Sequence, residues 1–171
     1  MQRPDELLDV VNERDEIIDR ATRRDVHDRG LRHRAIHVLL FNPDGELFVQ
    51  KRSVTKDTFP LCYDSSAAGH LDSGETYDAC AVRELREELS LNVPLPRLTR
   101  CFKITACPET GLEFVWVYSL RGDYHPQINL DEIESGRFWP VAEIERVVAE
   151  QPECCARSFV RIFREFRQRD G

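Results

Sequence analysis

Residues 69–91 read GHLDSGETYDACAVRELREELSL, and this stretch combines a glycine with acidic residues at fixed spacing. Gly69 is followed by Glu75, and the run RELREE, residues 83–88, begins eight positions after Glu75. Residues 76–89 contain no glycine or proline and are rich in Ala, Leu, Arg and Glu. This composition predicts a helix, with Thr76 as its N-cap.

Three acidic residues of this predicted helix share one face, because Glu84, Glu87 and Glu88 follow helical spacing. On an arbitrary surface helix they would form a solvated acidic face. Their fixed distance from Gly69 and Glu75 favours a metal site instead, since converging carboxylates are the ligands that a hard cation such as Mg²⁺ prefers.

The stretch resembles the Nudix box, whose pattern is Gly, five residues, Glu, seven residues, and then Arg-Glu-aliphatic-x-Glu-Glu-x-Gly-aliphatic. Every fixed position matches except the late glycine, where this sequence has Ser90. A serine that must adopt the left-handed conformation of that glycine should cost up to about 1 kcal/mol, unless Asn92 takes the left-handed turn. The flanking segments RHRAIHVLLFNPDGELFVQKRS (32–53) and DEIESGRFWPVAEI (131–144) are also similar to Nudix proteins. The resemblance therefore covers most of the chain.

The resemblance implies a fold and a domain organisation. Nudix domains are α/β/α sandwiches with a mixed β-sheet, in which the box forms a loop, a helix and a loop on one face. We therefore expect an α/β chain with a single Nudix domain over residues 1–171. An N-terminal hairpin extension at residues 1–30 precedes the box at 69–91.

The resemblance also implies roles for the box residues. Glu84, Glu87 and Glu88, with the carbonyl of Gly69, are expected to hold one or more Mg²⁺ or Mn²⁺ ions. Arg83 is expected to orient these carboxylates and belongs with them to the catalytic set. Glu75 completes that set, either by bracing Arg83 or as a further ligand. The general base stays open between Glu84 and two acids of the later loop, Glu132 and Glu134.

Within the superfamily, the sequence is similar to the branch that includes isopentenyl-diphosphate isomerase, from His33-Arg34-Ala35, Gln50-Lys51-Arg52 and Ala-Gly-His-Leu at 68–71. This similarity implies that Arg52 and Lys56 bind a diphosphate, whereas the alternative role of these charges is to keep a strand soluble. His33, His70 and Glu113 match part of that branch's separate metal site. His27 lies near a further ligand position, but Gly111 stands where the branch has a second acid. We therefore do not expect a complete second metal site, and the role expected of each histidine alone is local hydrogen bonding.

The expected function is that of a metal-dependent hydrolase, which cleaves a diphosphate bond in a nucleoside diphosphate linked to another group or in a related organic diphosphate. One alternative is an isomerase-like enzyme. It is disfavoured because Ala68 stands where the isomerases have a cysteine, and a methyl group cannot transfer a proton. The other alternative is a catalytically silent binding module, which is disfavoured because all the box glutamates are present.

Composition limits the remaining classes. The chain has 171 residues and a formal net charge of −7, which gives no basic surface for nucleic acid or an anionic membrane. No apolar run has the length of a signal peptide or a membrane span, so we expect a soluble cytoplasmic protein. The six cysteines show no zinc-site spacing and are expected to be reduced thiols.

Outside the box, the pattern predicts hairpins at residues 7–21 and 35–50, two antiparallel strands at 98–106 and 113–120, and a short strand at 136–139. Two helices should begin at Pro140 and Pro152. The second helix repeats apolar residues that should face either the core or the partner in a homodimer. These residues are Phe159, Val160, Phe163 and Phe166.

Overall fold

The computed structural model describes residues 5–170, so residues 1–4 of the expected extension and Gly171 lie outside the described residues. A seven-stranded mixed sheet has the order β5-β4-β3-β8-β7, with β6 paired to β3 and β9 paired to β4. These strands are β3 (His33–Phe41), β4 (Leu47–Arg52), β5 (Tyr63–Asp64), β6 (Ala67–His70), β7 (Thr99–Ile104), β8 (Glu113–Arg121) and β9 (Ile133–Trp139). The sheet contains both the parallel pair β3–β8 and antiparallel pairs.

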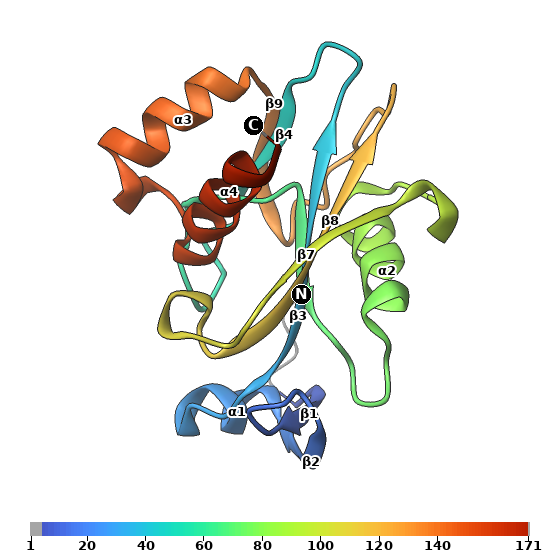
Figure 1. Ribbon diagram of the computed structural model, residues 1–171, viewed down its shortest axis with the longest axis vertical. Helices are drawn as coiled ribbons and strands as arrows, with labels where there is room; N and C mark the ends of the chain where they lie inside the picture. The colour runs from blue at the N-terminus through green and yellow to red at the C-terminus, as the bar shows by residue number, and fades with distance from the viewer. Residues whose placement is uncertain (1–4, 171) are drawn as a thin grey trace.

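Helices cover both faces of this sheet. Helix α2 (Tyr77–Leu89) lies on one side, whereas α3 (Val141–Glu150) and α4 (Arg157–Asp170) lie on the other (Figure 1). The two-stranded sheet of β1 (Leu7–Val11) and β2 (Ile17–Thr22) sits with α1 (Arg23–Arg29) at one end of the molecule (Figure 1). The expected α/β sandwich with a mixed sheet is confirmed.

Strand β3 is central because both of its faces are apolar and covered. Ile36, Val38 and Leu40 belong to the apolar cluster under α2. Leu39 and Phe41 belong to the cluster that contains the apolar side of α4. Such a continuous apolar run is typical of a strand buried on both faces.

Strands β3 and β4 form the expected hairpin only at its turn, where Phe41 pairs with Leu47. Farther from the turn, β3 pairs with β6 and β8, while β4 pairs with β5 and β9. Strand β9 begins at Ile133, before the expected residue 136, and follows β4 to Trp139. Residues of both strands, among them His37 of β3 and Arg52 of β4, line the cleft described below.

The box helix ends as the late box position requires, although that position is not a glycine. Ser90 itself adopts the left-handed conformation with φ of 56°, and its N–H donates to the carbonyl of Arg86 at 3.1 Å. The N–H of Leu91 donates to the carbonyl of Leu85 at 3.0 Å. Ser90, rather than Asn92, therefore takes the left-handed turn.

The terminal helix differs from the prediction at its start. Pro152–Cys154 forms a separate 3₁₀ turn, and α4 begins only at Arg157. The prediction that Pro152 opens the helix was wrong because the intervening residues join the sheet: the N–H of Ala156 donates to the carbonyl of Tyr63 at 2.8 Å. Phe159, Phe163 and Phe166 are buried in the core of their own chain, so the core alternative holds for them.

Candidate active site

The box glutamates reach the sheet where β6 passes under α2. Glu84 and Glu88 are buried, whereas Glu87 is exposed. A Cβ atom at Gly69 would lie only 1.9 Å from Oε1 of Glu84, so the strand must have a glycine here for the carboxylate to approach. Oε2 of Glu88 accepts hydrogen bonds from the N–H of Ala68 at 3.1 Å and from Nε2 of Gln50 at 3.0 Å.

Arg83 connects the carboxylates of the box. Its Nε and Nη2 donate to the two carboxylate oxygens of Glu75 at 2.9 and 2.8 Å, a bidentate pair. Its Nη1 donates to Glu84 at 2.6 Å and to Glu87 at 3.3 Å. Glu75 therefore braces Arg83, which leaves Glu84, Glu87 and Glu88 to face the cleft.

The close approach of these acids affects their protonation. Burial, followed by the charge of Glu88, raises the pKa of Glu84 to about 8. Burial also raises the pKa of Glu88, although the charge of Lys56 and the hydrogen bonds from Ala68 and Gln50 oppose this. A crowded group of oxygen donors of this kind fits a hard divalent cation, whose charge would favour the ionised carboxylates.

Two of the predicted basic residues lie in the same cleft and are held in place. Arg52 donates from Nη1 to Oδ2 of Asp64 at 2.9 Å and from Nε to the carbonyl of Thr58 at 3.1 Å. Lys56 donates a hydrogen bond to Glu132, and its Nζ lies 3.8 Å from Oε1 of Glu88. Of the two later acids, Glu132 thus lies in the cleft, whereas Glu134 is exposed on β9.

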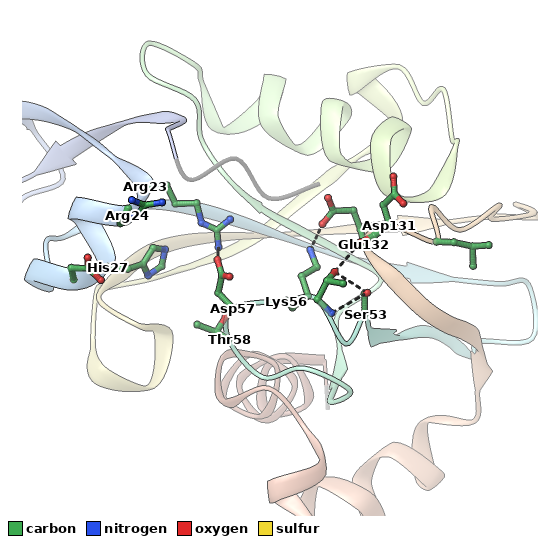
Figure 2. A pocket seen from close by; sticks show the side chains of 12 residues that line it. Arg23, Arg24, His27, Ser53, Lys56, Asp57, Thr58, Asp131 and Glu132 are labelled. Carbon is green, nitrogen blue, oxygen red and sulfur yellow. Dashed lines mark hydrogen bonds and ion pairs between the residues drawn. The ribbon is translucent and has the colours of Figure 1, made fainter.

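Two adjoining cavities open beside these groups. The first has a volume of about 710 Å³ and is lined by Arg52 and by three box glutamates, Glu84, Glu87 and Glu88. The second, of about 670 Å³, lies between α1 and the loops at residues 53–58 and 130–132 (Figure 2). Arg23, Lys56 and Glu132 line both cavities. Volumes of this size suit small-molecule ligands.

Arg23 is a site residue that sequence reasoning missed. It comes from α1, its side chain is 9% exposed, and its Nε is buried without a hydrogen-bond partner in the described part of the chain. Figure 2 shows its guanidinium directed toward Asp57, and the closest atoms of this ion pair are 3.9 Å apart. Nothing in the sequence indicates that Arg23 lines a cavity, because two adjacent arginines, Arg23 and Arg24, are common in a polar helical turn.

His37 and Gln50 were also missed. His37 lies on β3, lines the larger cavity, and contacts Oγ of Ser65 through Nδ1 at 2.8 Å. Burial lowers the pKa of His37. Gln50 orients Glu88 by the hydrogen bond given above. The sequence contains no signal for His37 or Gln50, because each lies in a strand whose neighbouring residues are ordinary apolar core residues.

The predicted histidine cluster is brought together by the fold. Ring nitrogens of His27, His33 and His70 lie within 4.8 Å of one another. Nε2 of His70 contacts Oε1 of Glu113 at 2.9 Å, and Nε2 of His33 lies 3.5 Å from the same oxygen. Gly111 contributes no side chain at the position of the second acid. Nδ1 of His33 also contacts the carbonyl of Leu31 at 2.9 Å, so local hydrogen bonding, the role expected of each histidine alone, is present for His33 and His70.

The six cysteines are free thiols. Among the described residues, no helix is both long enough and apolar enough to cross a membrane.

Comparisons with known proteins agree with the box. The family model for the NUDIX domain matches residues 31–157. An uncharacterized Nudix hydrolase from Streptomyces coelicolor is 39% identical over 150 residues, which cover 85% of this chain and 80% of that protein. Isopentenyl-diphosphate Delta-isomerase 2 from Photorhabdus laumondii is 30% identical over 151 residues, covering 87% of this chain and 85% of that protein. A crystal structure of a Deinococcus radiodurans protein superposes with a TM-score of 0.81 at 31% identity, covering 94% of this chain and 98% of that one.

Proposed function

This chain belongs to the Nudix hydrolase family and is a pyrophosphohydrolase of the Nudix type, and we propose that Mg²⁺ or Mn²⁺ supports its reaction. The proposed substrate is a nucleoside diphosphate linked to another group, or a related organic diphosphate. The observation that carries this proposal is the meeting of buried glutamates and held basic side chains in one cleft. Nudix hydrolases generally use divalent metal ions, and the crowded carboxylates of this cleft suit them.

In the proposed reaction, Glu87 and Glu88, together with the carbonyl of Gly69, would hold the metal, and Glu84 would be either a further ligand or the general base. A bound divalent cation supplies charge neutralisation on the diphosphate oxygens and a lower pKa for the attacking water. Arg83, fixed by Glu75, keeps two of the carboxylates in place. This preorganisation supports binding of the ion without rearrangement of the helix.

In this proposal the substrate is held by cations that line the same cleft. Arg52 is fixed by Asp64 and Thr58, so its guanidinium is already oriented for a diphosphate oxygen. Lys56 and Arg23 add positive charge at the junction of the two cavities. The general base in this proposal is Glu84. If Glu84 binds the metal instead, Glu132 takes this role, because it also lies in the cleft.

The isomerase relative provides a second candidate function, which the residue at the proton-transfer position disfavours. Ala68 lies on β6 beside Glu88, and its methyl group can neither donate nor accept a proton. We therefore expect no formation of allylic diphosphate from isopentenyl diphosphate. A silent binding module is disfavoured because all the box glutamates are present, and Glu84 and Glu88 are buried in the cleft.

The test is a substrate panel assayed for release of phosphate or nucleotide with Mg²⁺ and with Mn²⁺. The panel includes nucleotide sugars, dinucleoside polyphosphates, NADH, ADP-ribose and prenyl diphosphates. Metal-dependent turnover that is lost in Glu88→Gln supports the proposal. Absence of turnover on the whole panel contradicts hydrolysis, and allylic product formed at an enzyme-like rate would favour the isomerase.

A further inference from the structure

The N-terminal hairpin, formed by β1 and β2, precedes the segment that matches the family model. It is nevertheless hydrogen-bonded to the box loop at residues 72–75. The N–H of Ser73 donates to the carbonyl of Leu7 at 2.8 Å. Asp9 accepts hydrogen bonds from Oγ of Ser73 at 2.7 Å and from the N–H of Gly74 at 2.9 Å. These three bonds fix the loop to β1.

The burial and the hydrogen bonds of Asp9 suit it to this contact. It is 4% exposed, and Nε of Arg20 on the neighbouring strand also donates to it, at 3.3 Å. Burial alone would raise the pKa of Asp9, but the hydrogen bonds from Gly74 and Ser73 and the charge of Arg20 hold it below its ordinary value. The carboxylate is therefore ionised at neutral pH and accepts every bond that reaches it.

The loop that is bonded to β1 is a tight turn at residues 72–75, and Glu75 is its last residue. The N–H of Glu75 donates to the carbonyl of Asp72 at 2.8 Å, and Gly74 has φ of +83°, the left-handed value that a type II turn needs at this position. The N–H of Asp72 in turn donates to Oε2 of Glu75 at 3.1 Å. The position of the Glu75 carboxylate thus depends on the turn that Asp9 holds.

From Glu75 the contacts continue to the proposed metal ligands. Glu75 holds Arg83 in a bidentate pair, and Arg83 donates to Glu84 and Glu87. A series of contacts therefore runs from Asp9, outside the matched family domain, to two box carboxylates. It consists of hydrogen bonds on either side of the 72–75 turn, joined by the covalent backbone from Gly74 to Glu75.

A second contact fixes the same hairpin at the start of α2. Asp15, in the hairpin turn, accepts from the hydroxyl of Tyr77 at 2.9 Å and from Nε of Arg34 at 2.6 Å. Tyr77 is the first residue of the box helix. The hairpin thus holds the box both at its loop and at its helix.

We propose that Asp9 is a positioning residue for the reaction, acting through the 72–75 turn, Glu75 and Arg83 on the carboxylates that bind metal. This inference rests on the proposed function for the identity of the metal-binding acids. The N-terminal hairpin is accordingly part of the catalytic unit. Mutation of a residue that orients metal ligands from outside the ligand set typically changes metal affinity or activity by 10- to 100-fold.

The experiment compares Asp9→Asn with the wild type and with Asp19→Asn, an exposed acid on the same hairpin. Affinity for Mn²⁺ is measured by titration without substrate, and kcat and KM are measured on whichever diphosphate is hydrolysed. We expect Asp9→Asn to weaken Mn²⁺ binding and lower kcat by about 10-fold, with a smaller change in KM. Asp19→Asn should match the wild type.

A double-mutant cycle separates positioning from general stabilisation. In a Glu75→Gln background, Asp9→Asn should have less than about a 2-fold further effect, because the series of contacts is already broken. The same factor in both backgrounds would overturn the proposal. So would unchanged affinity and kcat in the single variant.

A readout without metal keeps this test independent of the proposed function. The Nε–H proton of Arg83, paired with Glu75, should exchange with solvent faster in Asp9→Asn than in Asp19→Asn. Absence of Mn²⁺ binding in the wild type would contradict the metal site, while unchanged exchange of this proton would contradict the inference. If Asp9→Asn is too unstable to purify, Ser73→Ala removes one of the three bonds and serves in its place.

Discussion

Nζ of Lys56 lies 3.8 Å from Oε1 of Glu88, so a cation of the protein stands beside a carboxylate that we assign to the metal. Both side chains are less than 10% exposed. The ammonium compensates a buried negative charge that would otherwise be costly. Without metal, the stability of the cleft should therefore depend on this lysine.

We predict that Lys56→Met destabilises the metal-free protein by about 2–4 kcal/mol, because it leaves buried carboxylates uncompensated. The loss should shrink when saturating Mn²⁺ supplies positive charge. Urea unfolding with EDTA and with Mn²⁺ measures both values. Lys51→Met, on strand β4 just before the loop that carries Lys56, is the control. An equal loss under both conditions would contradict the prediction.

Replacing the proposed ligands should separate activity from folding. Glu87→Gln and Glu88→Gln should each lower kcat by at least about 100-fold, because each removes a charge that holds the metal. The fold should remain, since the change also removes repulsion among the three acids. Circular dichroism checks the fold, Glu150→Gln on α3 is the control, and full activity in both variants would refute the metal-site assignment.

Acid should destabilise the protein partly through His37. Burial lowers the pKa of His37, so the folded state favours the neutral ring, whereas the unfolded state takes up a proton near pH 6.5. Its contribution to stability is thus present above pH 6.5 and is lost as the pH falls toward the lower folded pKa. The loss between pH 7 and pH 5 should be smaller in His37→Gln by on the order of 1 kcal/mol. His125→Gln, an exposed change, should leave the pH profile of urea unfolding unaltered, and identical profiles for all three proteins would contradict this prediction.

Ser90→Gly should stabilise the protein by up to about 1 kcal/mol, because a glycine adopts the left-handed conformation without a steric penalty. The greater freedom of glycine in the unfolded chain offsets part of the gain. Thermal melts measure the difference. A matched Asn92→Gly change should lower the melting temperature or leave it unaltered, and a destabilised Ser90→Gly would show that the serine side chain contributes a contact of its own.

Local features of the fold could be read from the sequence because their causes are local. The box helix begins after Thr76 and ends before Ser90, as its composition and cap indicate. The pairing of β3 was less accessible. The hairpin prediction was correct at the turn, but beyond Phe41 and Leu47 the two strands separate. There β6 pairs with β3 and β5 pairs with β4 in place of the hairpin pairing.

The residues of the candidate site also fall into two groups, those that could be predicted from the sequence and those that could not. Gly69 and the three glutamates of α2 were predicted from their spacing and from the resemblance to the Nudix box, which alone implied the role of the Gly69 carbonyl. Asp9 and Arg23 were not, because a polar residue on a short strand or helix reads as solvent-facing. Their burial depends on how residues 5–30 dock against the box loop and the cleft, which no local pattern encodes.

The parallel pairing of β3 with β8 has a consequence for synthesis of the chain. His33 pairs with Glu113 and Phe41 with Arg121, so the central strand emerges from the ribosome long before its partner does. Until β8 arrives, β3 carries an apolar run with one unsatisfied edge, which is a site for pairing with the wrong chain. Folding is also slowed, because the entropy cost of closing the long chain segment between β3 and β8 comes before their contacts stabilise the sheet. Nascent chains that end between β6 and β8 should therefore depend most on chaperones.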